Sequence, residues 1–134
     1  MDLNFDSLFN HVYDVKDCEL ITYERGRIVL RTIVNESCCN PYGMAQGGFL
    51  YTLCDNAAGL LGYSLGSYVV TMQSSINYIS SVRNGEILTI EAKAIHDGRS
   101  SKVCELVVCN EKGTLICKAT FTMFVVKKIE EEKQ

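Results

Sequence analysis

Hydrophobic and polar positions alternate along most of the second half of the chain, and this pattern predicts a series of β-strands. Alternation places successive side chains on opposite faces, so each strand can bury one face. The predicted strands cover residues 69–79, 86–95, 102–109 and 114–126. Turn residues separate these four strands from one another, at Asn84-Gly85, Asp97-Gly98 and 110–113. In strand 69–79, the even positions Val70, Met72, Ile76 and Tyr78 are predicted to share one face.

The first part of the chain predicts two further strands and a short helix. Residues 19–23 and 27–34 form a predicted hairpin around Gly26, and the second strand places four residues on one face: Ile28, Leu30, Thr32 and Val34. Residues 3–13 have the spacing of a short amphipathic helix. Residues 35–47 are expected to form a loop, and the charged residues 127–134 a frayed tail.

A different pattern covers residues 49–65, where nearly every position is apolar or small whichever helical face is counted. A helix that is apolar all round is expected to be buried. This segment contains one carboxylate, Asp55. An ionised carboxylate inside a protein is costly unless it is paired or hydrogen-bonded, so Asp55 is the first candidate for chemistry.

Together these elements predict an α+β fold in a single domain over residues 1–134. About five or six antiparallel strands each have one apolar face, and the sheet can bury this face by curling around the long helix. Strand 69–79 follows the helix and is predicted to lie at an edge of the sheet. Because a long unpaired edge invites pairing with another copy, a two-fold dimer joined edge to edge through this strand is expected.

Composition excludes several other classes of function. The chain has 134 residues and a net charge of −3, which argues against a nucleic-acid-binding protein. Seven cysteines without a C-x-x-C pair, and only two histidines, give no metal-site pattern. The odd cysteine count and the absence of a signal peptide indicate reduced thiols in the cytoplasm. No apolar run reaches the length of a membrane span, so we expect no membrane association.

The segment that joins the loop to the helix carries a recognisable motif. Asn40, Gly43, Gly47, Gly48 and Asp55 match the signature N-x-x-G-x-x-H-G-G followed seven residues later by Asp. The chain therefore resembles the hotdog-fold thioesterases, and more specifically the PaaI-like thioesterases of phenylacetate pathways. Gln46 departs from that signature, because it stands where the family usually has His. Gln can donate a hydrogen bond through its amide but does not titrate near pH 7.

The resemblance implies an acyl-CoA thioesterase that hydrolyses a small or medium acyl- or arylacetyl-CoA. It implies no metal and no cofactor beyond the coenzyme A of the substrate, and a homodimer that pairs into a dimer of dimers. The Gly47 N–H would polarise the thioester carbonyl, while Asp55 would act as nucleophile or general base. Asn40 would orient the attacking group or water, and Thr71 would help to hold that water. Gln46 stands in place of the family's His, which hydrogen-bonds around the thioester. In the family, Asn and Gly come from one subunit and Asp from the other.

Helix geometry agrees with such a shared site, since Gly47 and Asp55 lie about 12 Å apart along one helix. Candidate residues for the acyl pocket are Gly48, Tyr51, Leu53, Cys54 and Asn56. Candidates for binding the phosphates of coenzyme A are Arg83, Arg99, Ser100, Ser101 and Lys102.

Less specific interpretations remain open for these residues. Asp55 could be a structural acceptor, Asn40 a turn residue, Thr71 an ordinary strand residue, and the arginines solvated surface charges. At the level of function, the alternative is a hotdog domain that binds acyl-CoA without hydrolysing it, as a sensor or scaffold. A hotdog dehydratase or hydratase is less favoured, because it would need a histidine in the loop or helix, where neither His11 nor His96 lies.

Overall fold

The structure is a computed structural model that describes residues 18–129. It contains one long helix, α2 (Gly47–Ser64), and a short 3-10 turn, η2 (Glu36–Cys38). Six strands complete the described part of the chain: β1 (Glu19–Glu24), β2 (Arg27–Ile33), β3 (Ser67–Tyr78), β4 (Ile87–Asp97), β5 (Ser101–Asn110) and β6 (Leu115–Lys128). The predicted helix at 3–13 lies outside the described residues.

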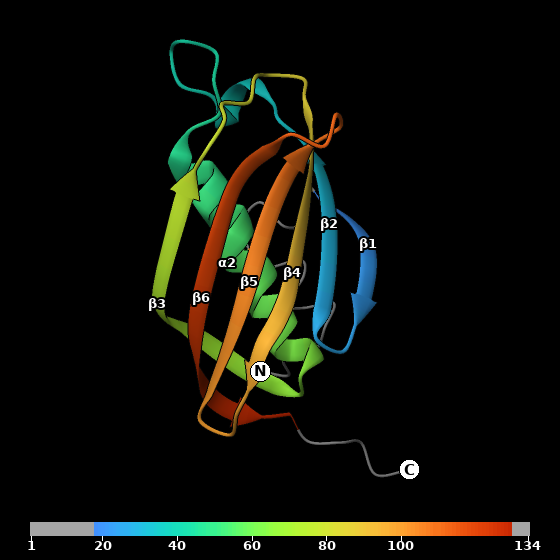
Figure 1. The fold of residues 1–134 in the computed structure, drawn as a ribbon, viewed down its shortest axis with the longest axis vertical. Helices are drawn as coiled ribbons and strands as arrows, with labels where there is room; N and C mark the ends of the chain where they lie inside the picture. The colour runs from blue at the N-terminus through green and yellow to red at the C-terminus, as the bar shows by residue number, and fades with distance from the viewer. Residues whose placement is uncertain (1–17, 130–134) are drawn as a thin grey trace.

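All six strands form one antiparallel sheet in the order β1-β2-β4-β5-β6-β3. Helix α2 lies against one face of this sheet (Figure 1). The predicted layers, one long helix covered by a sheet of five to six strands, are confirmed. The prediction that the strand after the helix lies at an edge is confirmed too, because β3 pairs only with β6 and ends the sheet.

The alternation that predicted β2, β4, β5 and β6 also predicted which side chains form the core. The four residues assigned to one face of the second strand, positions 28, 30, 32 and 34, are all buried. The predicted inward residues Leu88, Ile90 and Leu106 have no exposed surface, and Phe121 is the largest fully buried side chain. Each such burial contributes roughly 1.5–3 kcal/mol to folding, so these faces fix the sheet on the helix.

The end of the chain is more ordered than the sequence predicted. The charged tail was expected from residue 127, but β6 continues to Lys128, where it pairs with Ser67 of β3. The N–H of Ile129 also donates to the carbonyl of Gly66 at 2.8 Å. Backbone pairing with the start of β3 therefore outweighs the preference of the charged side chains for a frayed end.

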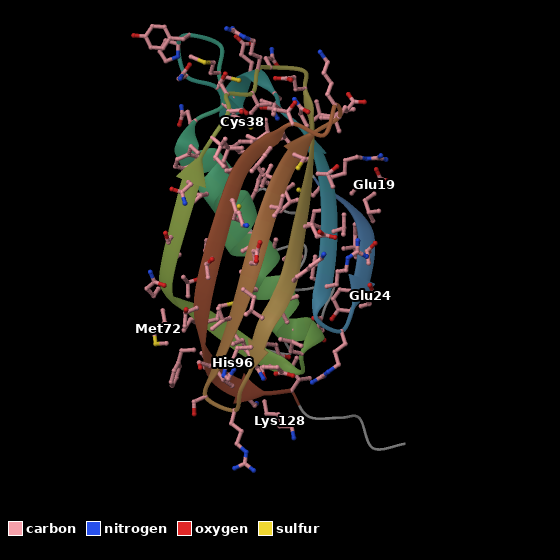
Figure 2. All side chains as sticks on the ribbon, in the orientation of Figure 1. Glu19, Glu24, Cys38, Met72, His96 and Lys128 are labelled. Atoms are coloured by element: carbon pink, nitrogen blue, oxygen red, sulfur yellow. The ribbon has the colours of Figure 1, made fainter. Side chains whose placement is uncertain are left out.

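Strand β3 corrects the predicted alternation. A β-bulge places Met72 as an extra residue, because Thr71 pairs with Met123 while Gln73 pairs with the next residue, Thr122. A bulge shifts the register by one residue and so reverses which positions face inward. Val70 and Met72 point outward and are 53% and 58% exposed, although Ile76 and Tyr78 face the helix as predicted. Figure 2 shows Met72 projecting from the edge of the molecule.

Helix α2 is buried along one stripe and not all round. The stripe that meets the sheet consists of Leu50, Leu53, Cys54, Ala57, Ala58, Leu60, Leu61 and Gly62. On the remaining surface of the helix, Gly48 is exposed, and Thr52, Asp55, Asn56 and Gly59 are half-buried. The sheet covers one side only, so the small residues on the other side keep contact with solvent in the protomer. Among the described helices, α2 included, no helix has both the length and the apolarity required to cross a membrane.

Candidate active site

The loop before α2 is organised by Asn40. Its side-chain Oδ1 accepts hydrogen bonds from the backbone N–H groups of Tyr42 at 2.9 Å and Met44 at 3.1 Å. Its backbone N–H donates to the carbonyl of Met44 at 2.7 Å. These bonds make Asn40 the turn residue that the simpler interpretation described. Both side-chain bonds use the oxygen, so the Nδ2 amide remains able to donate to a bound molecule.

Gln46 connects this loop to the helix. Its backbone N–H donates to the carbonyl of Cys38 at 2.8 Å, and its side-chain Nε2 donates to the carbonyl of Cys39 at 3.4 Å. The Gln46 carbonyl accepts from Phe49 and Leu50, which starts the helix. Gln46 therefore holds the loop by neutral hydrogen bonds and stands exposed at the helix entrance. Together with Asn40 it lines a hollow of about 690 Å³.

The first two residues of α2, Gly47 and Gly48, offer free backbone donors. No side chain caps the helix, since the cap residue Gln46 makes no side-chain capping bond. Within residues 18–129, neither glycine N–H has an acceptor. The first N–H groups of a helix point along its axis and carry its partial positive charge, which favours an oxygen that gains negative charge. The absence of a Cβ lets such an oxygen approach closely.

Asp55 lies two turns further along the same helix and faces β3. Its Oδ1 accepts a hydrogen bond from the hydroxyl of Thr71, so the structure brings these two predicted site residues together. The expected full burial of Asp55 is wrong for the protomer, because its side chain is half-buried beside the sheet edge. The bond to Thr71 orients the carboxylate and leaves its second oxygen available for chemistry.

Two further hydrogen bonds join α2 to β3, and sequence reasoning missed one partner in each. Tyr51 shares a hydrogen bond with the hydroxyl of Ser74, and the phenol of Tyr78 donates to the carbonyl of Gly47 at 2.8 Å. Burial raises the pKa of Tyr78, so its phenol keeps the proton that it donates. Alternation placed the even positions Ser74 and Tyr78 on the predicted inner face with Ile76, but neither belongs to the loop motif, so the sequence did not mark them as site residues.

Four of the predicted pocket residues have different surroundings. Tyr51 is half-buried and packs against Phe121, with tilted rings whose centroids are 5.4 Å apart. Asn56 is half-buried on the helix. Cys54 and the neighbouring Leu53 are fully buried in the core, away from any surface hollow. A hydrogen bond with Cys117, together with burial, raises the pKa of the Cys54 thiol, so it stays neutral. Tyr51 is therefore the strongest of these as a pocket residue.

The predicted phosphate-binding residues lie at two opposite ends of the sheet. Arg83 forms a bridge with Met44 beside the Asn40 loop. Arg99 and Lys102 instead line a hollow of about 1400 Å³ at the turn between β4 and β5. In Figure 2, Cys38 marks the first end, while His96 and Lys128 mark the second. Strand β4 has eleven residues, which separates the two ends by roughly 35 Å.

Of these cations, Lys102 already forms an ion pair within the protomer. Its side chain is buried and pairs with Asp97, which also pairs with Arg25 at 3.0 Å. Ser100 and Ser101 lie in the same turn, where their carbonyls accept from Val125 and Gly98. Neither Arg83 nor Arg99 has an ion pair within residues 18–129, so these two guanidinium groups are the ones free to meet a phosphate.

The arrangement thus consists of a helix start with two free N–H groups, a carboxylate held by a hydroxyl, and an adjoining edge strand. A comparison with protein families matches residues 42–117 to the thioesterase superfamily. This match includes the helix, β3 and β4, and covers more than half of the chain. The chain belongs to the thioesterase superfamily. Membership of this family of hydrolases confirms the prediction of a thioester hydrolase.

Solved structures and a curated relative extend this comparison. A hypothetical thioesterase of Streptococcus pneumoniae TIGR4, solved with coenzyme A, is 42% identical and superposes with a TM-score of 0.84 over 86% of this chain and 90% of the other. The 1,4-dihydroxy-2-naphthoyl-CoA hydrolase of Listeria monocytogenes serotype 1/2a (strain 10403S) is 29% identical over 113 residues, 82% of this chain and 91% of that protein.

The more specific resemblance is confirmed too. A mutant of the phenylacetic acid degradation protein PaaI from Thermus thermophilus is 25% identical to this thioesterase-superfamily chain. The two structures superpose with a TM-score of 0.77 over 81% of this chain and 93% of the other. The fold predicted from the motif, the hotdog fold, is therefore the observed one.

Proposed function

We propose that this protein is an acyl-CoA thioesterase, which hydrolyses a small or medium acyl- or arylacetyl-CoA to the free acid and coenzyme A. The observation that carries the proposal is the Asp55 carboxylate, held by the Thr71 hydroxyl on the helix whose first N–H groups are free. Water is the only other reactant, so the scheme includes no metal and no further cofactor.

Each group of the site supplies one part of the reaction. The thioester oxygen accepts from the Gly47 N–H, which stabilises the negative charge that develops on this oxygen. Asp55 either attacks the carbonyl carbon, forming an anhydride that water then hydrolyses, or removes a proton from the attacking water. In both routes the C–S bond breaks, the thiolate of coenzyme A leaves, and the acyl group gains the oxygen. The Asn40 amide and Gln46 hold the substrate beside the helix start.

The site is complete only when two copies of the chain meet. Gly47 and Asp55 of one copy are two helical turns apart, roughly 12 Å, which is too far for both to contact one carbonyl. The free edge of β3 supports antiparallel pairing with a second copy, which brings Asp55 of one chain toward Gly47 of the other. Strands β4 and β6 also expose the apolar side chains of Ile95, Phe124 and Val126, and we propose that these contribute to the pairing of two such dimers.

The relatives support coenzyme A as the carrier. The Streptococcus pneumoniae thioesterase was solved with coenzyme A, and the Listeria relative is named as a CoA hydrolase. Mutants of the Streptococcus pneumoniae thioesterase replace one Asp and one Thr by Ala. These two positions are 16 residues apart, the same separation as between Asp55 and Thr71 in this chain. An antiparallel dimer would bring the Arg83 end of one chain toward the Arg99 end of the other, so we propose that the two arginines contact one nucleotide. The seven free cysteines support a reducing compartment, the cytoplasm.

Hydrolysis of a panel of acyl-CoAs tests the proposal. Free coenzyme A is separated by chromatography, because the half-buried cysteines Cys38, Cys39 and Cys109 of the protein would themselves react with a thiol dye. We expect wild type to release coenzyme A, and Asp55→Asn and Asp55→Ala to lose at least about a hundredfold in kcat while still binding the substrate. Glu111→Gln, in the turn between β5 and β6, is the matched control and should match wild type.

The same panel decides the alternative function. If wild type binds acyl-CoA in calorimetry but releases no coenzyme A from any member of the panel, the protein is an acyl-CoA-binding sensor or scaffold. If wild type is active and Asp55→Asn is equally active, the assignment of Asp55 is wrong and the thioesterase assignment stands without it.

A further inference from the structure

Three hydrogen bonds at regular intervals join α2 to the edge strand β3. The helical residues Gly47, Tyr51 and Asp55 are each four positions apart and so lie on one face. Their partners on β3 are Tyr78, Ser74 and Thr71, in that order along the antiparallel direction. One end of this series holds the proposed base, and the other holds the proposed carbonyl-binding residue.

The contact at the Gly47 end is made by Tyr78, the last residue of β3. Its phenol donates to the Gly47 carbonyl at 2.8 Å, and its ring covers the glycine Cα. A Cβ at position 47 would lie 3.2 Å from the ring carbon Cζ, closer than nine in ten such contacts in proteins. The ring and the hydroxyl therefore hold the first residue of the helix from two directions.

This contact matters because, beyond the backbone bonds of the helix, no other side chain of the described residues restrains Gly47. Glycine has more conformational freedom than any other residue, and no side chain caps this helix. The Gly47 carbonyl also belongs to the same peptide unit as the Gly48 N–H. A hydrogen bond accepted by the Gly47 carbonyl polarises this peptide unit and makes the Gly48 N–H a stronger donor.

We propose that Tyr78 is a positioning residue, which holds the Gly47 peptide so that the free N–H groups at the start of α2 point at the thioester oxygen. The inference rests on the proposed function, because it gives these N–H groups their role. Tyr78 acts through Gly47 and need not touch the substrate. Its hydroxyl is expected to serve the transition state, in which the oxygen carries more charge than in the bound substrate.

Tyr78→Phe tests the proposal, since it removes only the hydroxyl. Tyr78 is 50% exposed, so water can replace the lost bond and the variant is expected to fold. We expect kcat to fall roughly three- to tenfold, the range of one neutral hydrogen bond, while KM stays within about twofold. Tyr23→Phe is the matched control, because Tyr23 lies on β1 at the opposite edge and is 40% exposed. It should leave kcat unchanged.

Glycine-labelled NMR spectra provide a second readout that does not depend on catalysis. The chain has 10 glycines, so the amide signals of Gly47 and Gly48 can be assigned from a small set. Loss of the bond to the Gly47 carbonyl is expected to move the Gly48 amide signal in Tyr78→Phe and to leave it in place in Tyr23→Phe.

The results separate the two proposals. An inactive wild type overturns the proposed function and the catalytic role of Tyr78 with it, while the NMR spectra still report whether the contact exists. An active wild type with unchanged kcat in Tyr78→Phe overturns the positioning role alone. A raised KM with unchanged kcat also overturns it, because Tyr78 would then bind substrate. A fall in kcat that accompanies a lower Tm without any shift of the Gly48 amide signal shows a purely structural effect and refutes the proposal.

Discussion

The hydrogen bond between Thr71 and Asp55 gives the sharpest prediction about catalysis. Thr71→Val keeps the shape and β-branching of the side chain, which suit a strand, and removes only the hydroxyl. The lost bond has a carboxylate acceptor and is worth about 1.5–3 kcal/mol. Since each 1.36 kcal/mol changes a rate about tenfold, kcat is expected to fall roughly ten- to hundredfold. Because Thr71 is exposed at the sheet edge, water replaces much of this bond in the free protein, and the free energy of unfolding should fall by about 1 kcal/mol or less, well below the effect on catalysis.

The assay measures coenzyme A release at saturating acyl-CoA, alongside urea unfolding of each variant. Thr71→Ser is the informative partner, because it restores the hydroxyl without the methyl group and should recover kcat to within about threefold of wild type. Equal activity in wild type, Thr71→Val and Thr71→Ser would show that the hydroxyl does not orient Asp55. An equal loss in both variants would show that the methyl group and not the hydrogen bond matters.

Two further predictions concern stability and assembly. The hydrogen bond from Lys102 holds the pKa of Asp97 below its ordinary value, so this carboxylate stabilises the fold at neutral pH and loses that contribution as the pH falls below about 4. Asp97→Asn leaves the buried ammonium of Lys102 without its carboxylate, so at pH 7 it should lower the urea midpoint more than Lys102→Met does. Near pH 2, where Asp97 of wild type is protonated, Asp97→Asn and wild type should have the same urea midpoint. Met72→Glu places a charge at the free edge of β3, and should yield folded, inactive monomers in analytical ultracentrifugation; an unchanged dimer would show that β3 is not the contact.

Most of the fold could be predicted because burial and chain geometry agree along most strands. In β4 and β5 the inward residues follow every second position, and Leu88, Ile90 and Leu106 reach the core as predicted. The edge position of β3 followed from its place after the helix. The role of the loop motif could be predicted only through the family resemblance, since Asn40 alone indicates no more than a turn.

The surroundings of Asp55 could not be predicted in the same way. Small residues such as Gly59 and Thr52 are found in protein cores, but they are also found on helix faces that a second copy or a ligand covers. Composition does not distinguish a core face from a contact face, because both kinds of face lack charged and bulky side chains. In the protomer the structure leaves this face half-open, which explains why the expected full burial of Asp55 was wrong.

The bulge at Met72 explains both the failed prediction for β3 and the geometry of the candidate site. Thr71 and Ser74 are an odd number of positions apart, so a regular strand would point them to opposite faces. The extra residue turns both toward α2, where they meet Asp55 and Tyr51. The same shift sends Met72 outward to the free edge, where pairing with a second copy is proposed. Local alternation thus fails where one strand must both hold the carboxylate and present a dimer contact, as expected for a functional site.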